Sequence, residues 1–173
     1  MIPIELRFTD EFGEALGRVE AKLDDMQPVF SDIGELMTER TKQRFRDGKG
    51  PDGVAWAPKS PHTIARQAKS EGRANTAPLH GPSGRLASEI SYEVSSQGVS
   101  WGSSLIYSAV MQHGAEAGSF GLSEGTDKNG NDFAVLLPFG DIPARPFIGV
   151  SDDDNLAIIA TFEEYLTGGL TGR

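Results

Sequence analysis

The sequence contains no cysteine among its 173 residues. Disulfide bonds and thiolate metal sites are therefore excluded, and the chain can fold in a reducing cytoplasm. Long hydrophobic runs are also missing: no stretch of about 18 apolar residues occurs, so the sequence predicts no membrane-spanning helix. The N-terminus, MIPIELRFTDEF, is acidic and lacks the basic-then-apolar pattern of a secretion signal. Nothing in the sequence indicates export.

The motifs that carry catalysis are absent as well. The three histidines, His62, His80 and His113, are far apart and form no H-E-x-x-H zinc motif. There is no G-x-x-x-x-G-K-[ST], no G-x-G-x-x-G, and GPSGR around Ser83 is not a G-x-S-x-G nucleophile elbow. The acids Asp152–Asp154 could chelate a cation, but they are better explained as stabilising a helix dipole. We therefore expect no enzyme, no cofactor and no metal site.

Positive charge is scarce overall but concentrated in one segment. The chain has 16 Lys and Arg against 25 Asp and Glu, a formal net charge of −9. Residues 40–85 nevertheless hold ten of the 16 cationic residues and three of the 25 acidic ones. This segment could contact phosphate or an acidic protein surface, the interpretation we prefer, or it could form a solvated, mobile loop. Arg40, Arg44 and Arg46 fall on the polar face of a predicted helix, which we interpret as solvated.

Two kinds of periodicity predict an α+β fold in a single domain, residues 1–167. Apolar residues recur at helical spacing, with capping residues, in segments 10–24, 27–46 and 151–166. Period-2 alternation predicts strands at 2–8, 86–95, 98–103 and 133–138. We expect about four strands in one mostly antiparallel sheet, covered by the two N-terminal helices and the C-terminal helix, because each apolar stripe needs an apolar partner.

Long connections are expected between these elements, because the chain has 21 glycines and 10 prolines. We expect flexible loops at 47–82 and 115–132. The first should contain a turn at Pro51-Asp52-Gly53 and a short helix from Pro61 to about Lys69. A disordered tail is expected at 168–173, because Gly168 and Gly169 should end the last helix.

A proline-rich strap, residues 138–149, leads into the last helix. Pro138, Pro143 and Pro146 fix φ and push the residues before them into extended geometry, so the strap cannot be helical. Arg145 is held between two of these prolines. We expect its planar guanidinium to bond backbone carbonyls or a carboxylate, within the chain or across a subunit boundary.

Two aromatic residues lie in irregular segments that have few other means of fixing their position. Trp56 follows the predicted turn in the first loop, and Phe147 ends the proline-rich part of the strap. Burying a large aromatic side chain would anchor each segment. We interpret both residues as packing anchors rather than ligand contacts.

Five segments form an ordered set of landmarks along the chain. They are RFRDGKGPDGVAWAP at 44–58, SPHTI at 60–64, SGRLASEI at 83–90, YSAVMQHGA at 107–115 and IPARPFIG at 142–149. Together they resemble the phage virion morphogenesis family, the tail-completion proteins of myophages and Mu-like phages, over about residues 1–167. The residues in these landmarks to which we assign structural or interface roles are Trp56, Arg85, Leu86, Tyr107, His113, Pro143, Arg145, Pro146 and Phe147.

The resemblance implies a small structural protein that completes the phage tail and allows it to join the DNA-filled head. It would be assembled in the host cytoplasm and reside in the neck of the virion. The implied partners are further copies of itself in a ring, a hexamer by analogy with the sixfold symmetry of tail tubes, together with the tail tube protein and the head–tail connector or stopper. Phage DNA would pass through the lumen without specific binding.

Two other classes of function remain open at this stage. A DNA-contacting connector module would use the basic segment 40–85, and its affinity for DNA would depend strongly on salt. A phage-encoded hydrolase would need a cavity with perturbed acids. If the ring forms, we expect an acidic or neutral lumen, with the basic segment turned outward or toward acidic neighbours.

Overall fold

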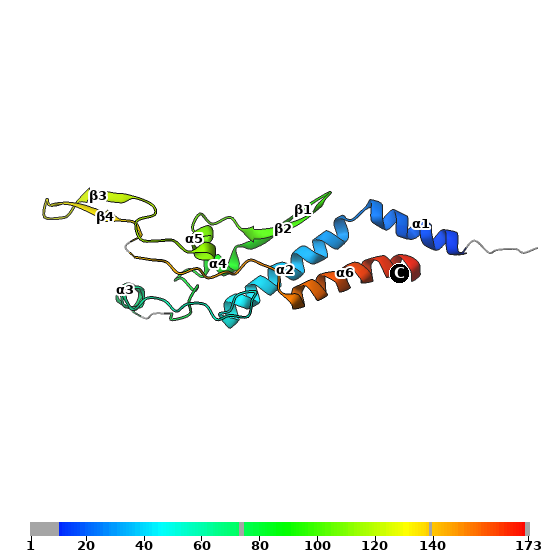
Figure 1. The fold of residues 1–173 in the computed structure, drawn as a ribbon, viewed down its shortest axis with the longest axis horizontal. Coiled ribbons are helices and arrows are strands. Elements are labelled where there is room, and N and C mark those ends of the chain that lie inside the picture. The colour runs from blue at the N-terminus through cyan, green and yellow to red at the C-terminus, as the bar shows by residue number, and fades with distance from the viewer. Residues whose placement is uncertain (1–10, 73–74, 139, 172–173) are drawn as a thin grey trace, which may run out of the picture. The chain divides into compact units, whose positions relative to one another are not determined.

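The computed structural model describes residues 11–72, 75–138 and 140–171, and these form an α+β fold (Figure 1). The helices in the described ranges are α1 (Glu11–Asp24), α2 (Gln27–Asp47), α3 (Pro61–Glu71), α4 (Arg85–Ser88), α5 (Ser108–His113) and α6 (Asp152–Thr171). The strands in these ranges are β1 (Ile90–Ser95), β2 (Gly98–Ser103), β3 (Leu122–Thr126) and β4 (Asp132–Leu136). The α+β class predicted from the sequence is confirmed.

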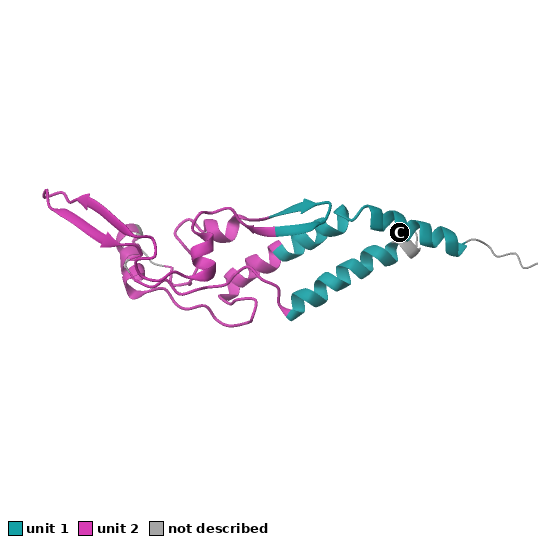
Figure 2. Cartoon of the chain, turned by 45° about the horizontal axis from the view of Figure 1, so that its top comes forward, with its two compact units in different colours: residues 1–37, 92–100, 152–173 teal, residues 38–91, 101–151 magenta. Residues whose placement is uncertain are grey.

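Backbone contacts divide the chain into two compact units, coloured separately in Figure 2. The first unit consists of residues 1–37, 92–100 and 152–173, and the second of residues 38–91 and 101–151. Three of the four borders fall inside α2, β1 and β2, and the fourth falls at the start of α6. The units are therefore not successive domains along the sequence, and each is described below by itself.

The first unit joins the two ends of the described chain. Helices α1 and α6 pack against each other, and Tyr165 on α6 donates its hydroxyl to the carbonyl of Asp25 at 2.5 Å. The Nζ atom of Lys22 lies 4.3 Å from the centroid of the Tyr165 ring, a cation–π contact. Phe30 of α2 meets Phe162 of α6 edge to face, with ring centroids 6.3 Å apart. Aromatic and cationic contacts thus hold the three helices together.

The second unit contains the main hydrophobic core. Its buried members are Phe45, Trp56, Leu79, Leu86, Ile90 and Phe147. The rings of Trp56 and Phe147 both lie against Phe45, with centroids 5.4 and 5.3 Å from it. Phe147 is only 1% exposed. The irregular segments are thereby attached to the end of α2 by three packed aromatic rings.

The helices follow the sequence prediction closely, and the capping residues explain why. Segments 10–24, 27–46 and 151–166 appear as α1, α2 and α6. The Oγ atom of Ser60 accepts from the Thr63 N–H at 3.2 Å at the start of α3, where Pro61 has no N–H group that would need an acceptor. One prediction about a helix end is wrong: α6 continues through Gly168 and Gly169 to Thr171. The packing of α6 against α1 extends a helix whose local sequence favours an earlier stop.

The predicted sheet of four strands is not formed by the described residues. They form two separate two-stranded antiparallel sheets, β1 with β2 and β3 with β4. Strand 2–8, also expected in the sheet, lies outside the described residues. The period-2 pattern identifies strands but not their partners, and each described strand pairs with its neighbour across a short turn. The start of the predicted strand 86–95 is also different, because α4 occupies Arg85–Ser88.

The segment 115–132, expected as a loop, contributes one side of a hairpin arm. Strand β3 lies within it and pairs with β4 from Leu122 opposite Leu136 to Thr126 opposite Asp132. Outside the two strands, Ala115, which precedes β3, and Ile142, which follows β4, exchange backbone hydrogen bonds of 2.9 and 2.7 Å. The four glycines of this segment obscured its alternation. One of them, Gly125, lies beneath the ring of Phe133, where a Cβ atom would approach the ring to 2.9 Å.

Replacing two helical glycines with alanine should give opposite effects on stability. Gly34 on α2 lies against the ring of Tyr92, and an added Cβ would overlap that ring, whereas nothing lies near a Cβ at Gly17 on α1. We expect Gly34→Ala to lower the free energy of unfolding by about 1–3 kcal/mol, and Gly17→Ala to raise it by about 0.5–1 kcal/mol. Chemical denaturation of both variants measures this, and equal effects would contradict the close approach of α2 to Tyr92.

Truncating either aromatic anchor, Trp56 or Phe147, should lower the stability of the protein. We expect Trp56→Ala and Phe147→Ala each to lower the free energy of unfolding by about 3–5 kcal/mol, because each leaves a cavity beside Phe45. The matched control is Val54→Ala in the same loop, where the side chain is 62% exposed and a change within about 0.5 kcal/mol is expected. Thermal or urea melts that show no difference between Trp56→Ala and Val54→Ala would refute the anchoring role.

Candidate functional site

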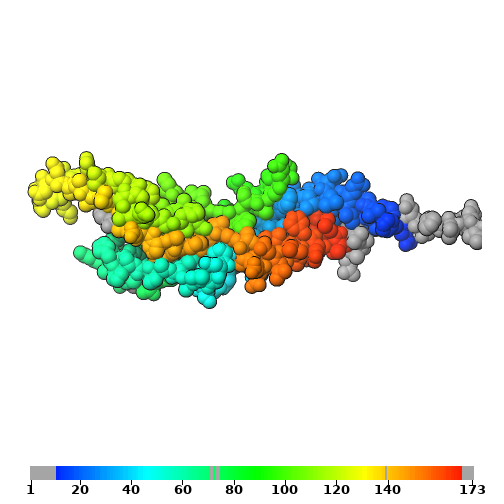
Figure 3. All heavy atoms as spheres, viewed as in Figure 1, coloured from blue at the N-terminus to red at the C-terminus, as the bar shows by residue number. Residues whose placement is uncertain are grey.

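The site is built around the strap, residues 138–149, which belongs to the second unit. Figure 3 shows its atoms between those of residues 50–85 on one side and residues 100–120 on the other. On the latter side the strap begins with the Ala115–Ile142 pairing and continues with the Arg145 N–H, which donates to the Met111 carbonyl at 2.8 Å. Prolines supply no N–H groups for a regular strand ladder. The rest of the strap is therefore held by side chains.

Arg145 holds the strap to the loop that follows Trp56. Its Nε donates to the carbonyl of Ala57 at 2.7 Å, one terminal nitrogen donates to that of Pro58 at 2.9 Å, and the other approaches its own neighbour Pro143 at 3.4 Å. The residue is 6% exposed. Burial lowers the pKa of Arg145 below its ordinary value, but a guanidinium stays charged in proteins. A fixed fork of donors thus binds neutral carbonyl oxygens of this same chain.

The side chain of Gln112 on α5 forms further hydrogen bonds with the backbone of the strap. Its Oε1 accepts from the N–H groups of Phe147 and Ile148 at 2.9 and 3.0 Å, and its Nε2 donates to the Ile148 carbonyl at 2.8 Å. Trp56 adds a hydrogen bond from its indole N–H to the Pro146 carbonyl at 2.8 Å. One amide side chain therefore replaces three bonds that a neighbouring strand would otherwise make.

The structure corrects the interpretation of Arg44, which lies on the predicted polar face of α2. The sequence predicted a solvated side chain, but Arg44 is buried and donates to the carbonyls of Phe147 and Gly149 at 3.0 and 2.9 Å. Its neighbour Arg46 is exposed and pairs with Glu39 at 2.8 Å. The difference arises because the strap passes over the end of α2 on the side of Arg44. Helical periodicity alone could not reveal that Arg44 would have hydrogen-bond partners in the strap.

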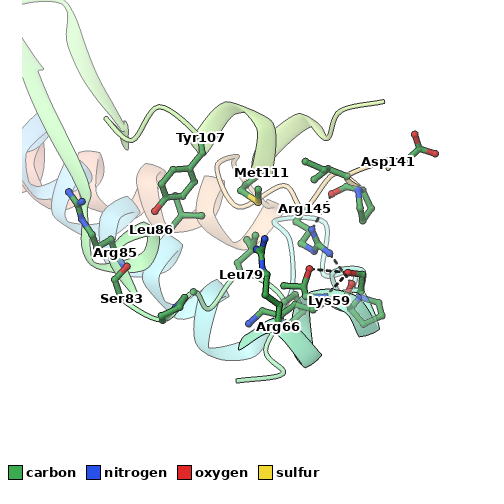
Figure 4. Close-up of a pocket in the computed structure, with 18 residues that line it drawn as sticks. Lys59, Arg66, Leu79, Ser83, Arg85, Leu86, Tyr107, Met111, Asp141 and Arg145 are labelled. Atoms are coloured by element: carbon green, nitrogen blue, oxygen red, sulfur yellow. Dashed lines mark hydrogen bonds between the residues drawn. The ribbon is translucent and has the colours of Figure 1, made fainter. Parts of the chain in front are cut away.

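Beside the strap lies a cavity of about 600 Å³ (Figure 4). Its apolar wall consists of Pro58, Pro78, Leu79, Pro82, Leu86, Met111, Ile142 and Pro143. The cationic residues that line it are Lys59, Arg66, Arg85 and Arg145, and the acidic one is Asp141. Tyr107 is 40% exposed there. The cavity combines an apolar wall with an excess of positive charge.

The cations around the cavity are held in different ways. Lys59 donates to the carbonyls of Asn75 and His80, each at 2.5 Å. Arg85 pairs with Glu89 at 2.6 Å, and this contact raises the pKa of the arginine. Arg66 projects from α3 toward the cavity (Figure 4). These positions give the cavity a basic rim suited to binding a carboxylate.

The structure brings together most of the residues assigned from the sequence landmarks. Those that line the cavity are Arg85, Leu86, Tyr107, Pro143 and Arg145. Trp56 and Phe147 lie in the adjacent core, and the carbonyl of Pro146 accepts the indole hydrogen bond. His113 is exposed at the end of α5 and does not line the cavity. Sequence reasoning missed Gln112, although the Q-H-G pattern at the end of α5 placed it within a landmark.

A profile of the phage virion morphogenesis family matches residues 9–167. The chain belongs to the phage virion morphogenesis family. No curated protein and no solved structure gives a significant match. The match covers both units and all five sequence landmarks. Membership makes the protein a phage morphogenesis component associated with the virion, in a family of structural type.

The described ranges lack two other kinds of feature. Within residues 11–72, 75–138 and 140–171, no three His, Asp or Glu side chains are grouped as metal ligands. In the same part of the chain, no helix has the length and apolarity needed to cross a membrane. The cavity beside the strap is the site that five of the nine residues assigned from the landmarks line.

Arg145 should not be replaceable by lysine. A lysine ammonium cannot reproduce the fork that spans the carbonyls of Ala57 and Pro58. We expect Arg145→Lys to lower the free energy of unfolding by about 1.5–3 kcal/mol, the range for hydrogen bonds to a charged group. The matched control is Arg66→Lys on exposed α3, where a change within about 0.5 kcal/mol is expected. Equal stability of the two variants in urea melts would contradict the role assigned to the fork.

Proposed function

We propose that this protein completes the phage tail by forming a ring at its head-proximal end, where the head is joined. The family gives the setting, virion morphogenesis. Within that setting, a ring that closes the tail suits a chain with an apolar, basic-rimmed cavity and abundant exposed apolar surface. Six copies would match the sixfold symmetry usual for tail tubes. The tail tube protein and the connector or stopper would contact opposite faces of the ring.

The observation that carries this proposal is the amount of apolar surface left in water. Among the described residues, 13 large hydrophobic side chains are exposed, whereas nine hydrophobic side chains are buried. The exposed side chains include those of Phe12 and Leu16 on α1 and of Leu156 and Ile159 on α6. We take this amount of exposed apolar surface as a sign of protein–protein contacts. A protein that works as one subunit of an assembly would bury these side chains against its neighbours.

DNA binding through the basic segment 40–85 has weaker support. Arg44 is buried against the strap, Arg46 pairs with Glu39, and Arg85 pairs with Glu89. These cations are already engaged within the chain. A ring of six chains at −9 each would carry a formal charge of about −54, which repels the phosphate backbone. Such a ring would let DNA pass through without holding it.

Phage particles that lack this protein test the proposal. We expect filled heads and separate tails to accumulate, since an unfinished tail end cannot join a head. The wild-type chain, supplied from a plasmid, should restore joined virions. A variant that unfolds, such as Phe147→Ala, should not restore them. Normal yields of joined virions without the protein, counted by electron microscopy, would overturn the proposed function.

A further inference from the structure

The β3–β4 arm and the cavity beside the strap have complementary properties. We propose that the cavity of one chain receives the arm of a second copy of this chain. The inference rests on the proposed ring, because it names the contact that would close it. Both features belong to the second unit, so every chain carries one donor arm and one acceptor cavity.

The arm has a surface that its own chain leaves uncovered. Strands β3 and β4 pack chiefly against each other, and an isolated two-stranded hairpin is at best marginally stable in water. Leu122 and Leu136 are cross-strand partners on one face and are 58% and 55% exposed. Phe120, which directly precedes this strand pair, is also exposed. A second surface that covers these side chains would stabilise the arm.

The tip of the arm is well ordered by its own hydrogen bonds. The carboxylate of Asp127 accepts from the N–H groups of Asn129 and Asn131 at 2.7 and 2.9 Å. These bonds hold the pKa of Asp127 below its usual value. Thr126 donates to Asp132 at 2.8 Å across the last strand pair. The arm can therefore enter a partner as a preformed element, which lowers the entropy lost on binding.

Charge favours a pairing between arm and cavity. Residues 115–138 carry four acids, Glu116, Glu124, Asp127 and Asp132, and one cation, Lys128. The cavity is lined by four cations and one acid. Three of these cations, Lys59, Arg85 and Arg145, are held by groups of their own chain, so the charge pairing would depend chiefly on Arg66. Glu124 lies on the same face of the arm as Leu122, so an apolar group and a carboxylate project together. The cavity offers the matching combination, Met111 and Leu86 with Arg66 at the rim.

A contact of this kind is heterologous, because arm and cavity are different surfaces of one chain. Two chains joined this way leave a free arm on one and a free cavity on the other. Repetition closes a ring if the rotation at each contact is right. The proposed contact therefore accounts for a closed assembly without a second kind of subunit.

The absence of cysteine from the sequence permits a direct crosslinking test. We would place one thiol on the arm and one at the cavity in the double variant Glu124→Cys/Ser83→Cys, and treat virions built from it with a short bis-maleimide. We expect a ladder of covalent multimers on denaturing gels, ending at the closed ring. The control Glu124→Cys/Ser96→Cys keeps the arm thiol and moves the other to the exposed turn between β1 and β2. It should give no ladder.

The outcomes separate this inference from the proposed function. Joined virions that contain the protein as an oligomer but give no ladder would overturn the arm contact and leave the function intact. A crosslink from the arm to a protein of different mass would also overturn it, because the occupant would not be a second copy. If the protein forms no oligomer, either free or on tails, both the ring and the arm contact fail.

A pair of neighbouring substitutions provides a second test on purified protein bound to tails. Leu122 and Ser123 are adjacent on β3 but face opposite sides of the arm. Leu122→Asp should reduce the number of copies retained per tail at least tenfold, because it places a charge in the apolar contact. Ser123→Asp adds the same charge to the other face and should leave retention within twofold. Equal retention of the two variants would contradict the proposed face.

Discussion

The second unit depends on how an extended, proline-rich strap satisfies its backbone. A buried carbonyl or N–H without a partner is costly, and prolines prevent the strap from pairing as a regular strand. Side chains from three separate segments provide the partners: Arg44 from α2, Trp56 from the following loop and Gln112 from α5. Arg145 makes the reverse contact, from the strap to the loop after Trp56. The strap thereby fixes the elements that surround it, and the cavity lies between these fixed elements.

Polar and apolar side chains have different roles in this arrangement. Several cations that might have bound DNA or solvent are used inside the chain, as Arg44 and Arg145 show. Large apolar side chains such as Phe12, Phe120 and Ile159 are left outside. The result is a chain whose internal order comes in large part from directed hydrogen bonds and which leaves many large apolar side chains exposed. A component of phage assembly needs both properties, because it must fold before it meets its partners.

The sequence predicted the local elements well because local signals specify them. Capping and periodicity located α1, α2, α3 and α6, and the family was evident from the landmarks between residues 44 and 149. The pairing of the strands was not predictable from the same signals, because period-2 alternation carries no information about partners. The burial of Arg44 and the role of Gln112 depend on where the strap passes, a tertiary feature. The β3 strand was missed because its glycine and polar residues resemble a loop.

Electron cryomicroscopy of isolated tails, before they join heads, tests the central claim most directly. We predict a ring of six copies of this chain at the head-proximal end of the tail tube. In that ring the surface that lines the channel should be acidic or neutral, and each subunit should touch its neighbours through two different surfaces. Tails whose head-proximal end lacks the chain, or a ring whose channel is lined by the basic residues of segment 40–85, would contradict the account.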